Sequence, residues 1–367
     1  MSLSFSALLV YAALAAEENI SATTGATLLA PGVYVLDGPV KTGVLVKDGK
    51  ALLVDCSESV SMEQLRKLGV DQVEMICLTQ HRRPNAMGAY LFVEDQGAQV
   101  VVAEKDRALF EEVDAYWSDW HNRWHIYHFQ PGPQVLQGRL RVARTVIGGD
   151  TIRWRGLTLR VLETPGATEG AVSYIVEVEG KSIAFIGDVM CGPGQIWDLY
   201  SLQKGFRKVG DYHGFLGMRE PLIESLHKLA AAAPALAVPS HGALVENVAE
   251  ASALLEERLN ALNRNYVSIS ALNHYFPSQF EDMKDDPTRM PRAEQLDPPS
   301  WVRRVAYTSF AVVADSGDAL LIDCGHDSVL TKLDEWQKGG TLKSLEGCWV
   351  THYHDDHVDT LFRLATR

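Results

Sequence analysis

The chain has 367 residues, of which 46% are hydrophobic and 22% are charged, and its 34 basic residues stand against 47 acidic ones. This composition predicts a globular protein with room for about two domains and argues against wholesale disorder. The net charge of −13 makes a nucleic-acid partner unexpected, because phosphate contacts need clustered lysine and arginine. The five cysteines include no CxxC pair, so neither a zinc ribbon nor a disulfide framework is indicated.

The amino terminus carries a short apolar run, LSFSALLVYAALAA, at residues 3–16. It is too short to cross a bilayer, which takes roughly 20 residues, so no stable membrane span is expected. The run ends in small residues, as a secretory signal does, although no lysine or arginine precedes it. We therefore expect residues 1–21 to be an apolar leader and the protein to be exported to the periplasm or beyond. The alternative is a buried helix in a cytoplasmic protein.

One sequence pattern occurs twice, at residues 43–56 and at residues 309–324. Each copy is an apolar run, a turn with a glycine, and a second apolar run that ends in Asp-Cys. This pattern predicts a β-hairpin whose second strand is buried. A helix and another strand ending in threonine follow each hairpin, at 62–68 and 73–79 in the first copy and at 329–336 and 345–351 in the second. The repeat predicts a tandem domain duplication.

The remaining elements fill the first copy far more than the second. Strands are predicted at 99–103, 140–147, 157–164, 171–178, 182–188 and 235–242, and helices at 222–233 and 245–262. Residues 266–300 are polar and rich in proline, which suits a linker. We expect a first domain at 22–265, a linker at 266–300 and an incomplete second domain at 301–367. The sequence is therefore expected to be part of a longer tandem protein.

A cluster of metal-ligand residues directly follows the last predicted strand, in the stretch Thr-His-Tyr-His-Asp-Asp-His. Side chains alternate along an extended segment, so His352 and His354 point to the same side. The turn that follows brings Asp356 and His357 to that side as well. Imidazole and carboxylate ligands suit zinc, and also iron or manganese. The stretch predicts a site for one or two metal ions.

This H-x-H-x-D-H stretch resembles the first signature of the metallo-β-lactamase superfamily. In the first copy, TPGATEG at 164–170, IGD at 186–188 and PSHG at 239–242 resemble its later motifs. The resemblance covers 22–265 completely and 301–367 in part. It implies a mixed α/β (α+β) fold, the four-layer αββα sandwich, with the site along one edge of the two sheets and with the second copy incomplete.

The first copy departs from the family at the metal-ligand positions. Aligned on Thr79, the family's ligand positions are occupied by Gln80, Arg82, Pro84, Asn85 and Ala167, and only Asp188 and His241 are of ligand type. Two ligands cannot hold a catalytic zinc, which needs three and an open position. Arg82 also places a fixed positive charge where a cation would sit. We therefore expect the first domain to be a metal-free pseudoenzyme domain.

The resemblance implies a metal-dependent hydrolase of a small-molecule substrate, with its chemistry in the second domain. His352, His354 and His357 would hold one metal, and Asp356, with a histidine beyond Arg367, a second. The metals would convert a bound water into hydroxide, which Asp356 would orient as a catalytic residue. Neither domain carries a full site within the 367 residues. Fold and metal set do not specify the substrate, and the oligomeric state stays open.

A second hypothesis comes from a different class of protein. Gln80, Arg82 and Asn85 could form a polar pocket in a non-catalytic binding or scaffold module. An arginine with amide neighbours suits an anionic ligand such as a carboxylate.

An aromatic segment with three histidines, His121, His125 and His128, lies between the first copy's predicted strands. On a helix, His121 and His125, or His125 and His128, would be close enough to bind a metal. An amphipathic segment packed on the sandwich is the simpler interpretation.

Overall fold

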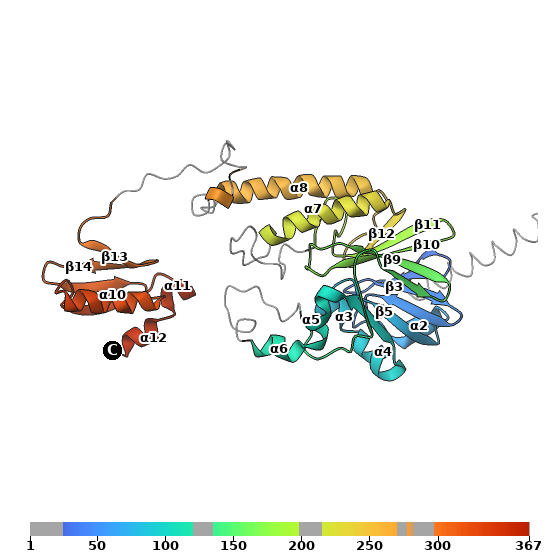
Figure 1. The fold of residues 1–367 in the computed structure, drawn as a ribbon, viewed down its shortest axis with the longest axis horizontal. Helices are drawn as coiled ribbons and strands as arrows, with labels where there is room; N and C mark the ends of the chain where they lie inside the picture. The colour runs from blue at the N-terminus through green and yellow to red at the C-terminus, as the bar shows by residue number, and fades with distance from the viewer. Residues whose placement is uncertain are drawn as a thin grey trace, which may run out of the picture. The chain divides into compact units, whose positions relative to one another are not determined.

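The computed structural model describes residues 25–119, 135–197, 215–269, 277–279, 281 and 297–366 (Figure 1). The chain divides into two compact units, Met1–Met290 and Pro291–Arg367, which we name unit 1 and unit 2. The expected leader at 1–21 and the three histidines of the aromatic segment lie outside the described residues.

Unit 1 begins with a seven-stranded sheet whose strands are neighbours in chain order. They are β1 (Ala26–Ala30), β2 (Val33–Leu36), β3 (Thr42–Lys47), β4 (Lys50–Val54), β5 (Gln72–Cys77), β6 (Gln99–Ala103) and β7 (Arg144–Val146). Strands β1 to β4 are antiparallel neighbours, and β4 to β7 run parallel. The hairpin predicted at 43–56 is confirmed as β3 and β4, which turn through Gly49 at a φ of 69°.

A second, five-stranded sheet follows in the order β12-β11-β10-β9-β8. Its strands are β8 (Thr151–Trp154), β9 (Leu157–Glu163), β10 (Val172–Val178), β11 (Lys181–Gly187) and β12 (Leu236–Pro239). Strands β11 and β12 are parallel, so the chain leaves both at the same edge of the sheet.

Helices cover the outer faces of both sheets (Figure 1). On the first sheet lie α2 (Met62–Lys67), α3 (Arg83–Ala86), α4 (Ala89–Gln96), the 3-10 turn η1 (Glu104–Asp106), α5 (Arg107–Glu111) and α6 (Val113–Ser118), and on the second lie α7 (Phe215–Ala232) and α8 (Val248–Ile269). Between the sheets, Leu52 and Val54 pack against Tyr174 and Phe185. Burying each such side chain contributes roughly 1.5–3 kcal/mol. Unit 1 is therefore the four-layer αββα sandwich that the resemblance implied.

Unit 2 has one described sheet, with the order β13-β14-β15-β16. Its elements are β13 (Val302–Ala306), β14 (Ser309–Val313), β15 (Asp318–Ile322), α10 (Asp327–Lys338), β16 (Ser344–Trp349), α11 (Asp355–Val358) and α12 (Leu361–Ala365). Helix α10 buries Val329 and Leu333 against Ala311 and Leu321 of the sheet. The hairpin predicted at 309–324 is confirmed as β14 and β15.

The two units share details of strand pairing. Strands β4 and β5 are parallel, and their register shifts between Ala51 and Leu52. Strands β15 and β16 are also parallel, and their register shifts between Ala319 and Leu320. The residue that follows the buried strand has a positive φ in both units, 56° at Asp55 and 61° at Asp323.

Some boundaries differ from the sequence predictions. Strand β7 covers only three residues of the strand predicted at 140–147, because its neighbour β6 pairs with those three alone. Helix α8 runs to Ile269, into the stretch expected to be a linker. In the part of the chain that the structure describes, no helix is long and apolar enough to cross a membrane.

Candidate functional site

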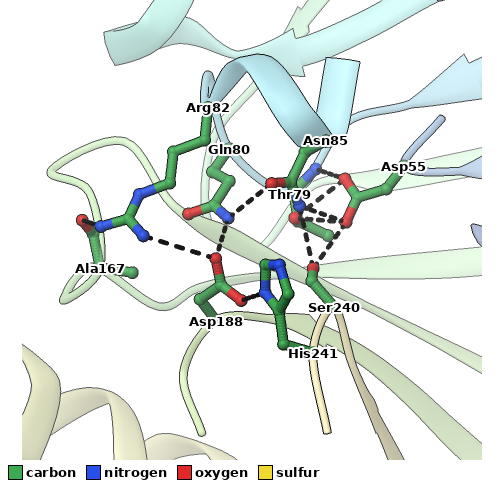
Figure 2. Close-up of polar contacts among 9 residues, drawn as sticks. All are labelled: Asp55, Thr79, Gln80, Arg82, Asn85, Ala167, Asp188, Ser240 and His241. Carbon is green, nitrogen blue, oxygen red and sulfur yellow. Dashed lines mark hydrogen bonds and ion pairs between the residues drawn. The ribbon is translucent and has the colours of Figure 1, made fainter. Parts of the chain in front are cut away.

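The candidate site of unit 1 lies where four strands end at one edge of the sandwich (Figure 2). Asp55 follows β4, residues 79–82 follow β5, Asp188 follows β11, and residues 240–241 follow β12. Ala167 lies in the turn between β9 and β10. Because β4 and β5 are parallel, as are β11 and β12, these strand ends meet at the same edge. The structure therefore brings together the positions predicted for the degenerate site.

Asp188 is the centre of the first group of contacts. Its Oδ2 accepts a hydrogen bond from Nε2 of Gln80 at 2.6 Å and lies 3.7 Å from Nη1 of Arg82. Its Oδ1 is 2.7 Å from Nδ1 of His241. Burial alone would raise the pKa of Asp188, but the bond with His241, the charges of His241 and Arg82 and the bond from Gln80 outweigh it and lower the pKa. The carboxylate is therefore held ionised without a metal.

Arg82 is buried, and its guanidinium fills the space between Asp188 and the turn before β10. Nη2 donates a hydrogen bond to the backbone oxygen of Ala167 at 3.0 Å. The side chain is only 5% exposed. A permanent cation thus occupies the side of the site from which Asp188 would bind a metal.

Asp55 is the centre of the second group of contacts. Its carboxylate accepts hydrogen bonds from the backbone nitrogen and hydroxyl of Thr79, from Nδ2 of Asn85 and from Oγ of Ser240, at 2.8–3.0 Å. Gln80 joins the two groups, because its Nε2 also donates to Oδ1 of Asn85 at 3.1 Å. The result is one hydrogen-bond network across both sheets, which we name the edge network.

Burial raises the pKa of Asp55 to about 6, and the hydrogen bonds that it accepts oppose that rise only in part. Folded unit 1 therefore binds more protons than the unfolded chain between about pH 4 and pH 6, so this group's contribution to stability falls as the pH rises through that window. We expect lowering the pH from 6.5 to 5 to raise the free energy of unfolding of unit 1 by about 1 kcal/mol through Asp55. Denaturant titrations at several pH values measure this slope, and Asp55→Asn should remove it; an unchanged slope in that variant would contradict the assignment.

Asp323 of unit 2 has contacts like those of Asp55, with a threonine in both units but a histidine in place of the asparagine. Oδ1 of Asp323 accepts the backbone N–H of Thr351 at 2.7 Å, and Oδ2 accepts the Thr351 hydroxyl at 2.8 Å. Oδ2 of Asp323 also lies 2.7 Å from Nδ1 of His357. In unit 1 the corresponding contact of Asp55 is with Nδ2 of Asn85. Burial would raise the pKa of Asp323, but the contacts with Thr351 and His357 lower it.

The predicted metal-ligand residues of unit 2 are neighbours after β16. The ring centroids of His352 and His354 are 4.3 Å apart, and those of His352 and His357 are 4.0 Å apart. Nε2 of His357 is 3.3 Å from Oδ2 of Asp356. Since Asp323 holds Nδ1, the Nε2 atom of His357 remains as its potential ligand atom.

The donor chemistry of unit 2 fits a divalent metal, with three imidazoles and two carboxylates in six positions. As the side chains stand, no group of three or more histidines, cysteines, aspartates or glutamates in the described residues is arranged to hold a metal ion. The motif is exposed or half-buried, so its side chains can change rotamer without repacking a core. In unit 1 the residues do not fit a metal, since amide and guanidinium donors face Asp188.

The sequence did not predict five residues of these sites, namely Asp55, Thr79, Ser240, Asp323 and Thr351. For Asp55 and Asp323 the available signal was the repeated Asp-Cys pair, because an aspartate follows the second strand of each hairpin. His81 contacts Asp106 instead of the edge network, with its Nδ1 3.2 Å from Oδ2 of Asp106.

Comparisons with known proteins were made for sequence and for structure. Residues 303–367 match the model of the metallo-beta-lactamase superfamily. No curated protein sequence matches the chain. Similar solved structures include BJP-1, a subclass B3 metallo-beta-lactamase of Bradyrhizobium japonicum, with 16% identity over 71% of this chain and 96% of that one and a TM-score of 0.46. The metallo-beta-lactamase MIM-1 of Novosphingobium pentaromativorans has 16% identity over 71% of this chain and 91% of that one, with a TM-score of 0.49. A metallo-beta-lactamase family protein of Thermus thermophilus has 22% identity over 69% of this chain and 90% of that one, with a TM-score of 0.48.

The family match falls on unit 2 and includes all four residues of its metal-ligand stretch. The sandwich of unit 1 agrees with the fold that this family implies. The sequence similarity to the metallo-β-lactamase superfamily therefore lies in residues 303–367, within unit 2.

Proposed function

We propose that the chain is a tandem protein of this superfamily in which unit 2 carries the metal-binding stretch of a hydrolase and unit 1 is a metal-free pseudoenzyme unit. The substrate is a small molecule, and zinc is the expected metal, with iron or manganese as alternatives. The observation that carries the proposal is the difference between the units at one place, where Asp323 contacts His357 and Asp55 contacts Asn85.

Support for the duplication comes from the backbone. Both units have a parallel strand pair with the same register shift, and both have an aspartate of positive φ after the buried strand. A backbone hydrogen bond also repeats, from Cys56 to Asn85 in unit 1 and from Cys324 to His357 in unit 2. A non-glycine residue of positive φ is uncommon, so its repetition at this position favours a common origin.

Support for metal binding by unit 2 comes from the contact that orients His357. Metal-ligating histidines usually donate their second ring N–H to a carboxylate or carbonyl, which fixes the tautomer and the ring. Asp323 is placed to accept from Nδ1 in this way. In this proposal His352, His354 and His357 hold the metal, and Asp356 binds a second ion or orients water.

A metal bound by these residues would supply a water of lowered pKa and would polarise a carbonyl or phosphoryl oxygen. The chain's own contribution is to hold the ligands at the carboxyl edge of β16. Thr351 ties that edge to Asp323 through its backbone and its hydroxyl, and Asp323 in turn sets the orientation of the His357 ring.

The contacts of Arg82 do not favour the anion-binding alternative. Its guanidinium already faces Asp188 and the carbonyl oxygen of Ala167, and it is buried. An added anion would have to displace the Asp188 carboxylate, which also contacts Gln80 and His241.

The proposal is tested in a version of the protein with a complete second domain, by hydrolysis of a panel of lactam, ester, thioester and phosphodiester substrates with and without added zinc or manganese. We expect metal-dependent hydrolysis that falls at least a hundredfold in His352→Ala/His354→Ala, because metal-activated water supplies most of the rate. His227→Ala is the matched control, since His227 is an exposed histidine of unit 1. Hydrolysis that survives the double change would count against the assignment.

A further inference from the structure

A groove of about 530 Å³ lies between β1, β12 and the first turn of α8. Its floor is apolar and is formed mainly by Leu29, Leu236, Leu244, Val245 and Leu254. None of its lining residues belongs to the edge network. The volume lies within the range of small-ligand sites, so the groove is large enough for a few residues of an extended chain.

One wall of the groove is the edge of a sheet. Strand β1 is the first strand of the seven-stranded sheet, and among the described strands it pairs only with β2. Three consecutive residues of β1, Thr27 to Leu29, line the groove. An exposed edge of this kind can add a strand from another polypeptide through backbone hydrogen bonds. One edge carbonyl, that of Leu29, currently accepts a hydrogen bond from Nζ of Lys181 at 3.0 Å.

The opposite rim is acidic. Glu246 and Glu250 line the groove where α8 begins, and both are exposed. Glu246 lies just before α8 and Glu250 lies in its first turn, so both carboxylates belong to the same part of the lining. Lys181 is the basic residue among the lining side chains. The rim therefore favours a cationic occupant over an anionic one.

We propose that this groove binds an extended peptide segment of alternating apolar and basic residues, which adds as a strand to β1. Side chains alternate along a strand, so one set would pack on the leucine floor and the other would reach Glu246 and Glu250. The interaction uses the two features that the groove combines, an open strand edge and an acidic rim.

The test uses the full chain and a fluorescent peptide of three Lys-Val repeats, measured by anisotropy. We expect saturable binding that weakens at least tenfold in Glu246→Lys/Glu250→Lys. Glu224→Lys/Glu257→Lys makes the same charge change at two exposed positions of α7 and α8 outside the groove lining and should leave binding unchanged. Binding that is absent, or equal in the groove variant and the control, would overturn the proposal.

A second peptide separates strand addition from simple charge attraction. The same sequence with all its backbone nitrogens methylated keeps its charge and its side chains but has no backbone N–H group to donate to β1. We expect this peptide to bind at least tenfold more weakly. Equal binding of the methylated peptide would overturn strand addition on β1.

Discussion

Replacing Arg82 with methionine is expected to lower the free energy of unfolding of unit 1 by about 3 kcal/mol. The change removes the guanidinium that lies beside the Asp188 carboxylate. Asp188 is buried, with 6% of its surface exposed. Breaking a buried ion pair by removing one partner costs roughly 3–5 kcal/mol, and the contacts of Asp188 with Gln80 and His241 place this case near the lower end. Denaturant unfolding measures the loss.

Two further variants make this expectation specific. Arg83→Met changes the neighbouring arginine, which is less buried, and should cost less than about 1 kcal/mol. Arg82→Met/Asp188→Asn removes both charges and should recover part of the loss, since no uncompensated carboxylate remains. If Arg82→Met were no more harmful than Arg83→Met, the guanidinium would not stabilise the edge network.

Replacing Asp323 with asparagine is expected to weaken metal binding by unit 2 about 10- to 100-fold. The variant loses the carboxylate that lies 2.7 Å from Nδ1 of His357, so the ring is no longer fixed in one tautomer and orientation. Competition with a chromogenic chelator measures the affinity.

Two matched variants control for a general loss of charge. Asp327→Asn removes an exposed carboxylate of unit 2 that pairs with Arg363 and should leave the affinity unchanged. Asp55→Asn changes the equivalent aspartate of unit 1 and should also leave it unchanged. An Asp323→Asn protein that is folded by circular dichroism and binds metal as tightly as the wild type would contradict the orienting role of Asp323.

Local patterns predicted the framework of the fold well. The two hairpins that end in Asp-Cys could be found because buried strands are continuous apolar runs bounded by turn residues. The family motifs placed Gln80, Arg82 and Asn85 at the degenerate site, and the structure brings them together with Asp188 and His241. The hairpins and this juxtaposition depend on spacing along the chain and on the parallel strands that align the strand ends.

The hydrogen bonds of the edge network could not be predicted in this way. The bonds from Ser240 to Asp55 and from Gln80 to Asp188 join residues more than a hundred positions apart in the sequence. Their existence depends on the distance between the two sheets and on side-chain rotamers, which no local pattern encodes. The sequence placed Gln80, Arg82 and Asn85 at these positions, and the structure adds which polar groups they contact.

Elemental analysis of the full chain, purified without a chelator or a histidine tag, tests most directly whether metal binding belongs to unit 2 alone. The account predicts about one or two zinc, iron or manganese ions per chain. This metal should be lost in His352→Ala/His354→Ala and kept in Asp188→Ala/His241→Ala. A metal-free wild-type chain, or metal that depends on Asp188 and His241 instead of His352 and His354, would contradict the account.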